Sequence, residues 1–412
     1  MDEQVFVIVG ASLAGANAAQ ALREAGFEGR LVLIGEETER PYERPPLTKG
    51  YLLGKEPRDK AFVHDANWYG EHGVELLLGV RATNLDAANH ALVLDGFEPL
   101  RYDKLLLATG SRVRRLDVPG VDLHGVRYLR TLPESDALRE DLRPGASVVV
   151  VGAGWIGLEV AAAAREHGAS VVVVEMEALP LHRVLGDEVA SVFERLHTSH
   201  DVAFRFSSTV AEIRGTAGRV TSVVLGDGTE LPADVVLVAI GITPATELAT
   251  AAGLRVDNGI VTDAALRTSA PDIFAAGDVA NAFNPLLGRA VRVEHWSNAL
   301  NGGKAVARSM LGEELAYDRV PYFFTDQYDL GMEYAGWAEP GGYDRVVFRG
   351  DVEGREFVAF WVSGGRVLAG MNVNVWDVQE QIQALVRAGY AGKAVDLAKL
   401  SDVDVALGDL VN

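Results

Sequence analysis

The sequence predicts an α/β protein in which two strand–turn–helix–strand units precede a C-terminal α+β domain. The first observation is a shared pattern in residues 4–37 and 147–177: an apolar run, a glycine turn, an Ala-rich segment ending near Gly, a second apolar run and an acidic residue. The second is a hairpin-like stretch followed by a buried strand after each unit, in residues 90–111 and 220–244. The third is a change of composition after Pro321, where aromatic-rich runs begin.

Composition limits the classes of function. Hydrophobic residues make up 48% of the 412 residues, which excludes wholesale disorder and suits two or three domains. A formal charge of −20 argues against nucleic acid as a partner, because binding phosphates requires a basic surface. The absence of cysteine excludes disulfides, cysteine-bound clusters and dithiol redox centres, and the histidines show no metal-binding spacing. No signal peptide or membrane span is visible, so we expect a cytoplasmic protein without a membrane partner.

The individual elements follow the same logic. Each repeated pattern is typical of a parallel βαβ unit, whose ligand lies at its first turn, so two such units predict two dinucleotide-binding domains. The apolar run at Lys104–Ala108 predicts a buried strand, and Gly226-Asp227-Gly228 predicts a hairpin turn. We further expect a helix from about Asn298 to Leu311 and another near residues 378–388.

The second unit carries the dinucleotide fingerprint Gly152-x-Gly154-x-x-Gly157 between a strand and a helix. These glycines allow a tight turn, close approach of a pyrophosphate and close packing of helix on strand, with the phosphates at the helix N-terminus. Glu175, 18 residues after Gly157, is placed to accept from both ribose hydroxyls, and the next two residues carry no positive charge for a 2′-phosphate. We therefore expect NADH rather than NADPH; a purely structural turn is the alternative.

The first unit departs from this fingerprint, because Ser12 takes the second glycine position in Gly10-x-Ser12-x-x-Gly15. Alone, this pattern is equally consistent with a structural turn. Glu36, 21 residues after Gly15, favours a second dinucleotide site.

Between Val5 and about Asp377 the sequence contains, in this order, the motifs GxSxxG, Glu36, ERPPLTK, LLLATGS, GxGxxGxE, AIGITP, TSxPDIFAAGD, EHWSNA and PYFFTDQYD. This order resembles that of the flavoprotein ferredoxin or rubredoxin reductases that serve bacterial cytochromes P450 and aromatic-ring dioxygenases. The resemblance implies a glutathione-reductase-like fold, with an FAD domain at residues 1–112 and 245–318, an NAD domain at 113–244 and a C-terminal α+β domain at 319–412. Disulfide reductases of this superfamily need redox cysteines, which this chain lacks.

The resemblance also implies where FAD binds. Its pyrophosphate lies at the first glycine turn, Glu36 holds the adenosine ribose, and Lys49 lies near flavin N5. Trp296 stands before a helix whose positive end faces flavin N1 and O2. For Lys49 a solvated loop lysine, for Asp278 an ordinary loop aspartate and for Trp296 a core tryptophan remain the alternatives. The expected FAD-binding residues are Gly10, Ser12, Gly15, Glu36, Arg44, Lys49, Ala108, Thr109, Gly110, Asp278 and Trp296.

For NAD, the resemblance adds Glu159, two residues after Gly157, which is expected in the first helical turn and in contact with the nicotinamide carboxamide. A carboxylate favoured there only by the helix dipole is the alternative. Lys49 and Glu159 are the residues expected at the reacting centre, where NADH delivers hydride to flavin N5 and no side chain acts as acid, base or nucleophile. The expected NAD-binding residues are Gly152, Gly154, Gly157, Glu159, Glu175 and Gly241.

The expected partner is an acidic iron–sulfur ferredoxin that docks near the flavin. The family motif often reads PWFWSDQ, but here Phe324 replaces the second Trp, so direct transfer from the flavin or a different acceptor both remain open. A chain of charge −20 needs a local basic face to attract such a partner. Two clusters are candidates: Lys49, Lys55, Arg58 and Lys60, or Arg112, Arg114 and Arg115.

Two other functions remain alternatives. One is an NADH oxidase or diaphorase, which passes electrons to oxygen or a quinone. The other is a redox-gated binding protein similar to apoptosis-inducing factor. Turnover separates the three, because a reductase discharges its electrons to ferredoxin and a switch retains them.

Overall fold

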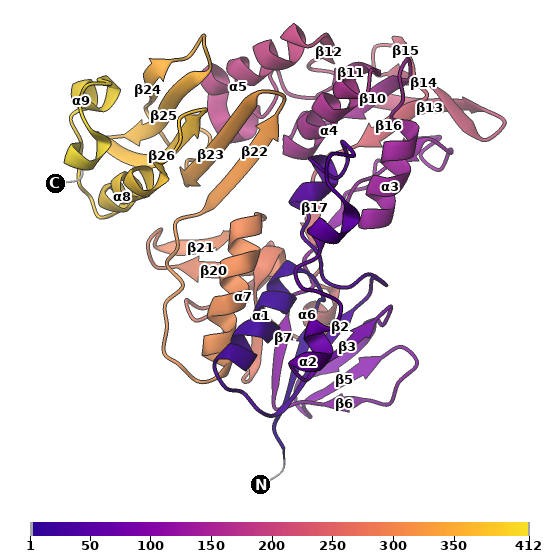
Figure 1. Ribbon diagram of the computed structural model, residues 1–412, viewed down its shortest axis with the longest axis vertical. Coiled ribbons are helices and arrows are strands. Elements are labelled where there is room, and N and C mark those ends of the chain that lie inside the picture. Colours follow the sequence, from indigo (N-terminus) through magenta and orange to yellow (C-terminus); the bar gives the residue numbers. More distant parts are fainter. Residues whose placement is uncertain (1–2, 411–412) are drawn as a thin grey trace. The chain divides into compact units, whose positions relative to one another are not determined.

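The computed structural model describes residues 3–410 and forms two compact units, each made of three stretches of chain (Figure 1). Unit 1 contains Met1–Glu43, Arg58–Arg112 and Thr243–Pro321, and unit 2 contains Arg44–Pro57, Val113–Ile242 and Tyr322–Asn412. This division is coarser than the three expected domains, whose boundaries stay a prediction. The short strands β8 (Ser111–Val113) and β17 (Ile242–Pro244) lie where the chain passes from one unit to the other.

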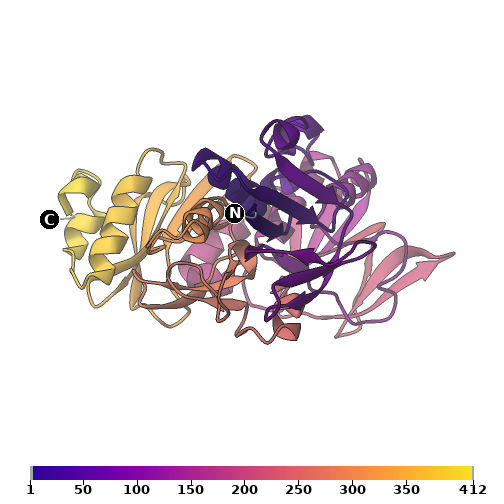
Figure 2. The same cartoon turned by 90° about the horizontal axis from the view of Figure 1, so that it is seen from below.

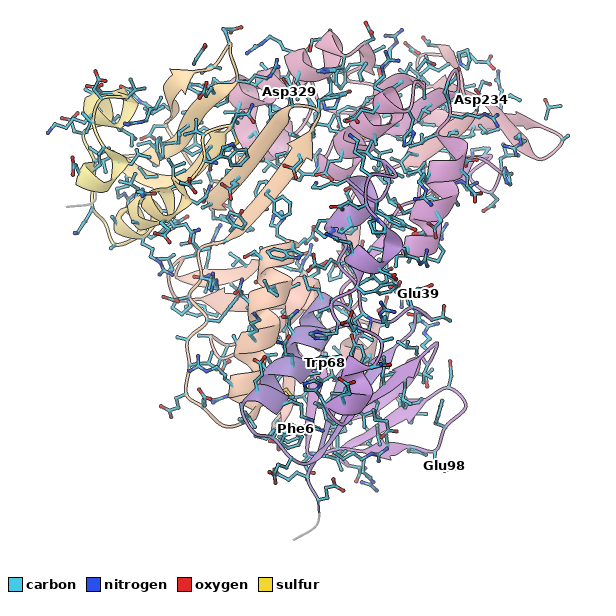
Figure 3. All side chains as sticks on the ribbon, in the orientation of Figure 1. Phe6, Glu39, Trp68, Glu98, Asp234 and Asp329 are labelled. Carbon is cyan, nitrogen blue, oxygen red and sulfur yellow. The ribbon has the colours of Figure 1, made fainter. Side chains whose placement is uncertain are left out.

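Unit 1 is built on a parallel sheet of order β19-β7-β1-β2-β3. Phe6 and Ile8 of β1 pack with the helices α1 and α7, and Val7 and Val9 pack on the opposite face. Phe6, which is labelled in Figure 3, belongs to this layer. Its ring stacks on that of Phe27, with ring centroids 4.0 Å apart. Burial of both faces explains why these strands are continuous apolar runs. The elements of this layer are β1 (Val5–Val9), α1 (Leu13–Glu24), β2 (Arg30–Gly35), α2 (Trp68–Glu71), β3 (Val74–Leu78), β7 (Lys104–Leu107), β19 (Ile273–Ala275) and α7 (Trp296–Met310).

Smaller elements complete unit 1. An antiparallel sheet contains β4 (Ala82–Asp86), β5 (Ala91–Leu94) and β6 (Leu100–Arg101), and a mixed one contains β18 (Ile260–Thr262), β20 (Ala280–Asn284) and β21 (Arg289–Arg292). Helix α6 (Glu247–Ala251) and the 3₁₀ turns η2 (Arg58–Ala61) and η3 (Gly277–Val279) lie between strands. The expected buried strand at residues 104–108 is confirmed by β7, and α7 begins two residues earlier than expected, so Trp296 is its first residue rather than preceding it.

Unit 2 contains a second parallel sheet, of order β12-β11-β10-β16-β9. Its βαβ unit repeats that of unit 1, and the expected turn at residues 226–228 joins the antiparallel strands β14 and β15. The elements are η1 (Pro45–Thr48), β9 (Val126–Arg127), α3 (Leu132–Asp141), β10 (Ser147–Val151), α4 (Trp155–Glu166), β11 (Ser170–Val174), α5 (His182–Ser199), β12 (Val202–Arg205), β13 (Val210–Thr216), β14 (Arg219–Leu225), β15 (Glu230–Pro232) and β16 (Val235–Val238).

The C-terminal part of unit 2 is an antiparallel sheet of order β22-β23-β26-β25-β24, with α8 against it (Figures 1 and 2). Gly389 of α8 lies directly over the backbone of Val367 in β26. The elements are β22 (Tyr322–Gln327), β23 (Leu330–Gly336), β24 (Arg345–Asp351), β25 (Glu356–Ser363), β26 (Arg366–Val373), α8 (Gln379–Tyr390), α9 (Leu397–Ser401) and η4 (Leu407–Leu410). Among residues 3–410, no helix has the length and apolar character needed to cross a membrane.

Candidate functional site

The second glycine turn, between β10 and α4, has the geometry that its sequence predicts. A Cβ at Gly152, whose φ is +102°, would overlap the carbonyl oxygen of Ala239, and a Cβ at Gly157 would overlap that of Gly152. Both positions therefore require glycine for packing within the protein. Gly154, the N-cap of α4, is different, because a Cβ there would meet nothing within 4 Å. Open space at the helix N-terminus, where backbone N–H groups lack intrahelical partners, fits a pyrophosphate.

Glu175 lies beside this turn, at the end of β11. Its Oε2 accepts a hydrogen bond from the backbone N–H of Ala153 at 2.6 Å, and its Oε1 accepts one from that of Glu177 at 2.9 Å. These bonds fix the carboxylate against the glycine turn, and each oxygen keeps acceptor capacity for a ribose hydroxyl. Arg183 of α5, which no sequence motif indicated, lies nearby, and its Nε donates to Oε1 of Glu177 at 2.6 Å. This hydrogen bond and the charge of Arg183 hold the pKa of Glu177 below its usual value.

The first glycine turn, between β1 and α1, repeats this arrangement. A Cβ at Gly10, whose φ is +123°, would overlap the carbonyl oxygen of Ala108, and a Cβ at Gly15 would overlap that of Gly10. Ser12 is the N-cap of α1 and makes no capping hydrogen bond with its side chain, which leaves the first turn of the helix accessible to an anion. The structure therefore fits a second dinucleotide at this turn.

Other predicted residues of unit 1 gather near the same edge of the sheet. Thr109 Oγ1 donates to the carbonyl oxygen of Ala245 at 2.7 Å, and Gly110 has a φ of +66°. Glu36 is about half exposed and forms long ion pairs with Arg112, at 3.4 Å, and Arg81, at 3.8 Å. Glu36 thus follows β2 directly, within reach of two cations.

The start of α7 brings together four further side chains. Burial lowers the pKa of His295, the N-cap of α7, to about 4, and the charge of Asp278 opposes this shift. Burial raises the pKa of Glu43, and a hydrogen bond with Trp296 opposes that rise. Asp278 and Trp296 therefore lie close to the same helix N-terminus, and their contacts with FAD stay a prediction. Glu43 and His295 belong to the quoted ERPPLTK and EHWSNA stretches, but the sequence analysis assigned them no role.

Lys49 and Glu159 lie in direct contact in unit 2. Oε1 of Glu159 accepts from Lys49 Nζ and, at 2.5 Å, from Thr325 Oγ1, while Oε2 accepts from Thr48 Oγ1. The side chains of Lys49 and Glu159 are only 16% and 7% exposed. Two chain segments, one with Thr48 and Lys49 and the other with Thr325, thus supply three donors to one buried carboxylate. The alternative of a solvated loop lysine does not hold, because the Lys49 ammonium is part of this cluster.

The position of Glu159 within α4 corrects one expectation. The helix begins at Trp155, so Glu159 is its fifth residue, and no acidic residue lies in the first turn. The fingerprint glycine Gly157 is itself inside the helix, which moves the glutamate one turn further along than the sequence analysis placed it. Favourable interaction with the helix N-terminus falls off within the first turn, so the dipole alone does not explain this residue.

Phe324, Arg44 and Gly241 also lie in unit 2. The Lys49 ammonium is 5.6 Å from the centroid of the Phe324 ring, so this departure from the family motif lies beside the buried cluster. Arg44 donates to the carbonyl oxygen of Arg130. Gly241, whose φ is +97°, accepts a backbone hydrogen bond from Arg114 at 2.9 Å. The roles of these residues in binding stay predictions.

Carboxylates pair with several members of the two candidate basic clusters. Lys55 pairs with Glu166 at 2.6 Å, and Arg58 pairs with Glu39 at 2.8 Å. Arg112 pairs with Glu36 and with Glu247, and the guanidinium of Arg115 lies 4.7 Å from the ring centroid of Tyr128. The choice between the clusters as a docking surface stays a prediction.

Comparisons with known proteins agree with this geometry. Residues 5–303 match the pyridine nucleotide-disulphide oxidoreductase family, and residues 322–411 match the reductase C-terminal family. The chain is 42% identical over 411 residues to the ferredoxin–NAD(+) reductase component of the anthranilate 1,2-dioxygenase system of Burkholderia cepacia, covering 99% of both chains. It is 39% identical to putidaredoxin reductase of Pseudomonas putida, covering 89% of this chain and 88% of that one.

Solved structures and a human relative extend the comparison. The covalent complex of putidaredoxin reductase with putidaredoxin matches with a TM-score of 0.93 at 35% identity, covering 99% of this chain and 98% of that one. Human apoptosis-inducing factor 3 is 35% identical over 391 residues, which are 93% of this chain and 63% of that protein. The resemblance, the fold class and FAD with NAD(H) as the cofactors are thereby confirmed. The chain belongs to the pyridine nucleotide-disulphide oxidoreductase family and carries the C-terminal domain of its reductases.

Proposed function

We propose that this protein is an NADH-dependent ferredoxin reductase, which passes electrons from NADH through FAD to an iron–sulfur ferredoxin that serves an oxygenase such as a cytochrome P450. The observation that carries the proposal is the buried Lys49–Glu159 pair beside the second glycine turn. The relatives named above as reductase components of a dioxygenase system and of putidaredoxin support the acceptor class. When bound, the two cofactors supply hydride transfer and the conversion of an electron pair into single electrons.

The chain's own residues bind and orient the cofactors. The N-termini of α1 and α4 hold the pyrophosphates, and Glu36 and Glu175 hold the adenosine riboses. Lys49 lies along the flavin, and Glu159 holds the nicotinamide carboxamide. The charges of Lys49 and Glu159 neutralise each other. The reacting centre therefore has a positioned donor, the Lys49 ammonium, and a positioned acceptor, the Glu159 carboxylate, and the pair adds no net buried charge.

The choice of NADH over NADPH is part of the proposal. Glu175 and Glu177 place two carboxylates where a 2′-phosphate would lie, and the nearby Arg183 is engaged by Glu177. Like charges disfavour the phosphate, whereas a ribose hydroxyl donates to Glu175. A cytoplasmic location also belongs to the proposal, and fractionation of cells that produce the protein would test it.

Anaerobic stopped-flow spectroscopy tests the function. The FAD-loaded protein is reduced with one equivalent of NADH and mixed with a [2Fe–2S] ferredoxin, in parallel with air-saturated buffer. We expect fast reoxidation of the flavin by ferredoxin and slow reoxidation by oxygen. Fast reoxidation by oxygen alone would identify an oxidase instead.

The similarity to apoptosis-inducing factor 3 favours a second candidate, a redox-gated binding protein. Such a protein retains its electrons, so both reoxidation reactions would be slow and a long-wavelength charge-transfer band would persist. The same experiment therefore separates the two candidates.

A further inference from the structure

A chain of buried polar side chains continues from Glu159 into the protein. Thr325 Oγ1, which donates to Glu159, accepts from Gln327 Nε2 at 3.1 Å. Oε1 of Gln327 lies 2.7 Å from Nε2 of His197, on α5. Thr325 and His197 are fully buried and Gln327 is 1% exposed, so water does not compete for these bonds.

The chemistry of the four groups fixes the direction of every hydrogen bond. The amide oxygen of Gln327 only accepts, so Nε2 of His197 carries the proton that lies between them. The amide nitrogen of Gln327 then faces Thr325 as a donor, so the single hydroxyl proton of Thr325 is left for Glu159. With the amide reversed, the hydroxyl proton would point at Gln327 and a lone pair would face the carboxylate.

His197 has the surroundings that keep it in this one form. Its Nδ1 is buried and has no hydrogen-bond partner among the described residues. The rings of Phe204 and Tyr328 lie 6.2 Å and 5.3 Å from the imidazole. Burial lowers the pKa of His197 to about 4, so the ring is neutral at physiological pH. A neutral imidazole whose Nε2–H donates a hydrogen bond carries no proton on Nδ1, so His197 is held as a single tautomer.

We propose that His197 is a positioning residue of the reductase reaction, which acts through Gln327 to hold the Thr325 hydroxyl as a donor to Glu159. The inference rests on the proposed function, because it is Glu159 that meets the nicotinamide there. Loss of the His197 donor frees the Gln327 amide to rotate and withdraws one of the three donors that fix the Glu159 carboxylate. A hydrogen bond to a charged group corresponds to about a tenfold effect or more, so we expect about tenfold weaker NAD⁺ binding and slower flavin reduction.

Two substitutions of similar size separate this role from packing. His197→Leu fills the apolar site and removes the donor, whereas the amide of His197→Gln replaces the Nε2–H. We call the connection from His197 through Gln327 to Thr325 the relay. It predicts that His197→Leu weakens NAD⁺ binding and slows flavin reduction, and that His197→Gln largely restores both. NAD⁺ affinity is measured by calorimetry on the oxidised FAD-loaded protein. If Leu matches the wild type, or if Gln is as impaired as Leu, the proposal is wrong.

A double-mutant cycle tests whether the effect passes through the Thr325 hydroxyl. In a Thr325→Val background the hydroxyl is already gone, so adding His197→Leu should not weaken NAD⁺ binding further. Additive losses would overturn the proposal. Thr325→Ser keeps the hydroxyl and serves as the matched control for the Val substitution.

A measurement on the unmodified protein covers the case in which a variant fails to fold. In ¹⁵N-histidine NMR, the wild-type His197 should show a protonated Nε2 and an unprotonated Nδ1; the opposite tautomer or an averaged signal would contradict the relay. The ferredoxin reaction distinguishes this inference from the proposed function. If ferredoxin does not reoxidise the flavin while the cycle and the tautomer behave as expected, the acceptor assignment fails and the relay stands.

Discussion

Two lysines of the 44–57 segment pair with two glutamates of the same helix, α4, and only one of the pairs is buried. The side chains of Lys49 and Glu159 are 16% and 7% exposed, whereas those of Lys55 and Glu166 are 62% and 34% exposed. Methionine keeps most of the aliphatic stem of lysine without its charge. Lys49→Met therefore removes one partner of a buried ion pair, and Lys55→Met is a matched control.

The two substitutions should differ clearly in their cost to the free energy of unfolding. Removing one partner of a buried pair costs about 3–5 kcal/mol, because the remaining charge stays desolvated. Thr48 and Thr325 still donate to Glu159 in the variant, so we expect the lower end, about 3 kcal/mol. An exposed pair is worth about 0–1 kcal/mol, which is the expected effect of Lys55→Met. For a unit of this size, about 3 kcal/mol lowers Tm by roughly 6–12 °C.

Thermal unfolding of both variants and of the wild type, each loaded with FAD, measures this difference. Stopped-flow reduction by NADH adds the functional readout, in which Lys49→Met should be slow or should lose FAD and Lys55→Met should behave as wild type. Equal values of Tm for the two variants would refute the reasoning that burial makes the Lys49 pair important. Normal reduction kinetics and FAD retention in Lys49→Met would remove its proposed place along the flavin.

Three further predictions concern other parts of the chain. Glu177→Gln releases Arg183, so kcat/KM for NADPH should rise about tenfold with little change for NADH; unchanged kinetics with NADPH would show that Arg183 does not reach the 2′-phosphate. Gly157→Ala places a Cβ in overlap with the Gly152 carbonyl oxygen, so calorimetry should show NAD⁺ affinity falling at least tenfold, and normal affinity would mean that the turn adapts. Burial lowers the pKa of His197 from 6.5 in the unfolded chain to about 4 in the folded protein, so the unfolded chain binds this proton more readily. The free energy of unfolding is therefore not affected by His197 above pH 6.5 and is lowered by about 3 kcal/mol at pH 4. Denaturant titrations across this range should show that His197→Gln has the flatter pH dependence.

The parallel layers of both units could be predicted from the sequence because local pattern and tertiary environment agree there. β1 and β10 are continuous apolar runs, and each lies in a sheet that is buried on both faces. The first residue of each turn after them is glycine because a Cβ at that position would overlap a neighbouring carbonyl oxygen. The start of α7 was less predictable. Its N-cap is His295, which makes no capping hydrogen bond, so the usual Ser, Thr, Asp or Asn signal is missing and the helix begins two residues before the expected position.

The candidate site could be predicted only where its residues follow one another at a fixed spacing. Glu175 follows its glycine turn across one helix and one strand, and such a spacing is set by βαβ geometry. Arg183 and His197 depend instead on the path of α5, which is interrupted at Gly186, a non-helical residue with φ of +75° inside the helix. A helical pattern in the sequence gives no measure of that interruption, so it does not indicate which side chains of α5 meet the βαβ unit or β22.

The burial of Glu159 argues against one of the two interpretations that its sequence position left open, the one that rests on the helix dipole alone. A glutamate favoured only by the helix dipole would lie in the first turn and face water, where it needs no partner from another segment. Glu159 lies one turn further and is 7% exposed, and its donors come from Thr48, Lys49 and Thr325. Desolvating a carboxylate costs several kcal/mol, and removing such a group would relieve the cost. The fold instead brings donors to this carboxylate from positions 110 and 166 residues away in the chain. These donors keep the charge of Glu159 at one place beside the glycine turn, as the proposed orientation of a nucleotide there requires.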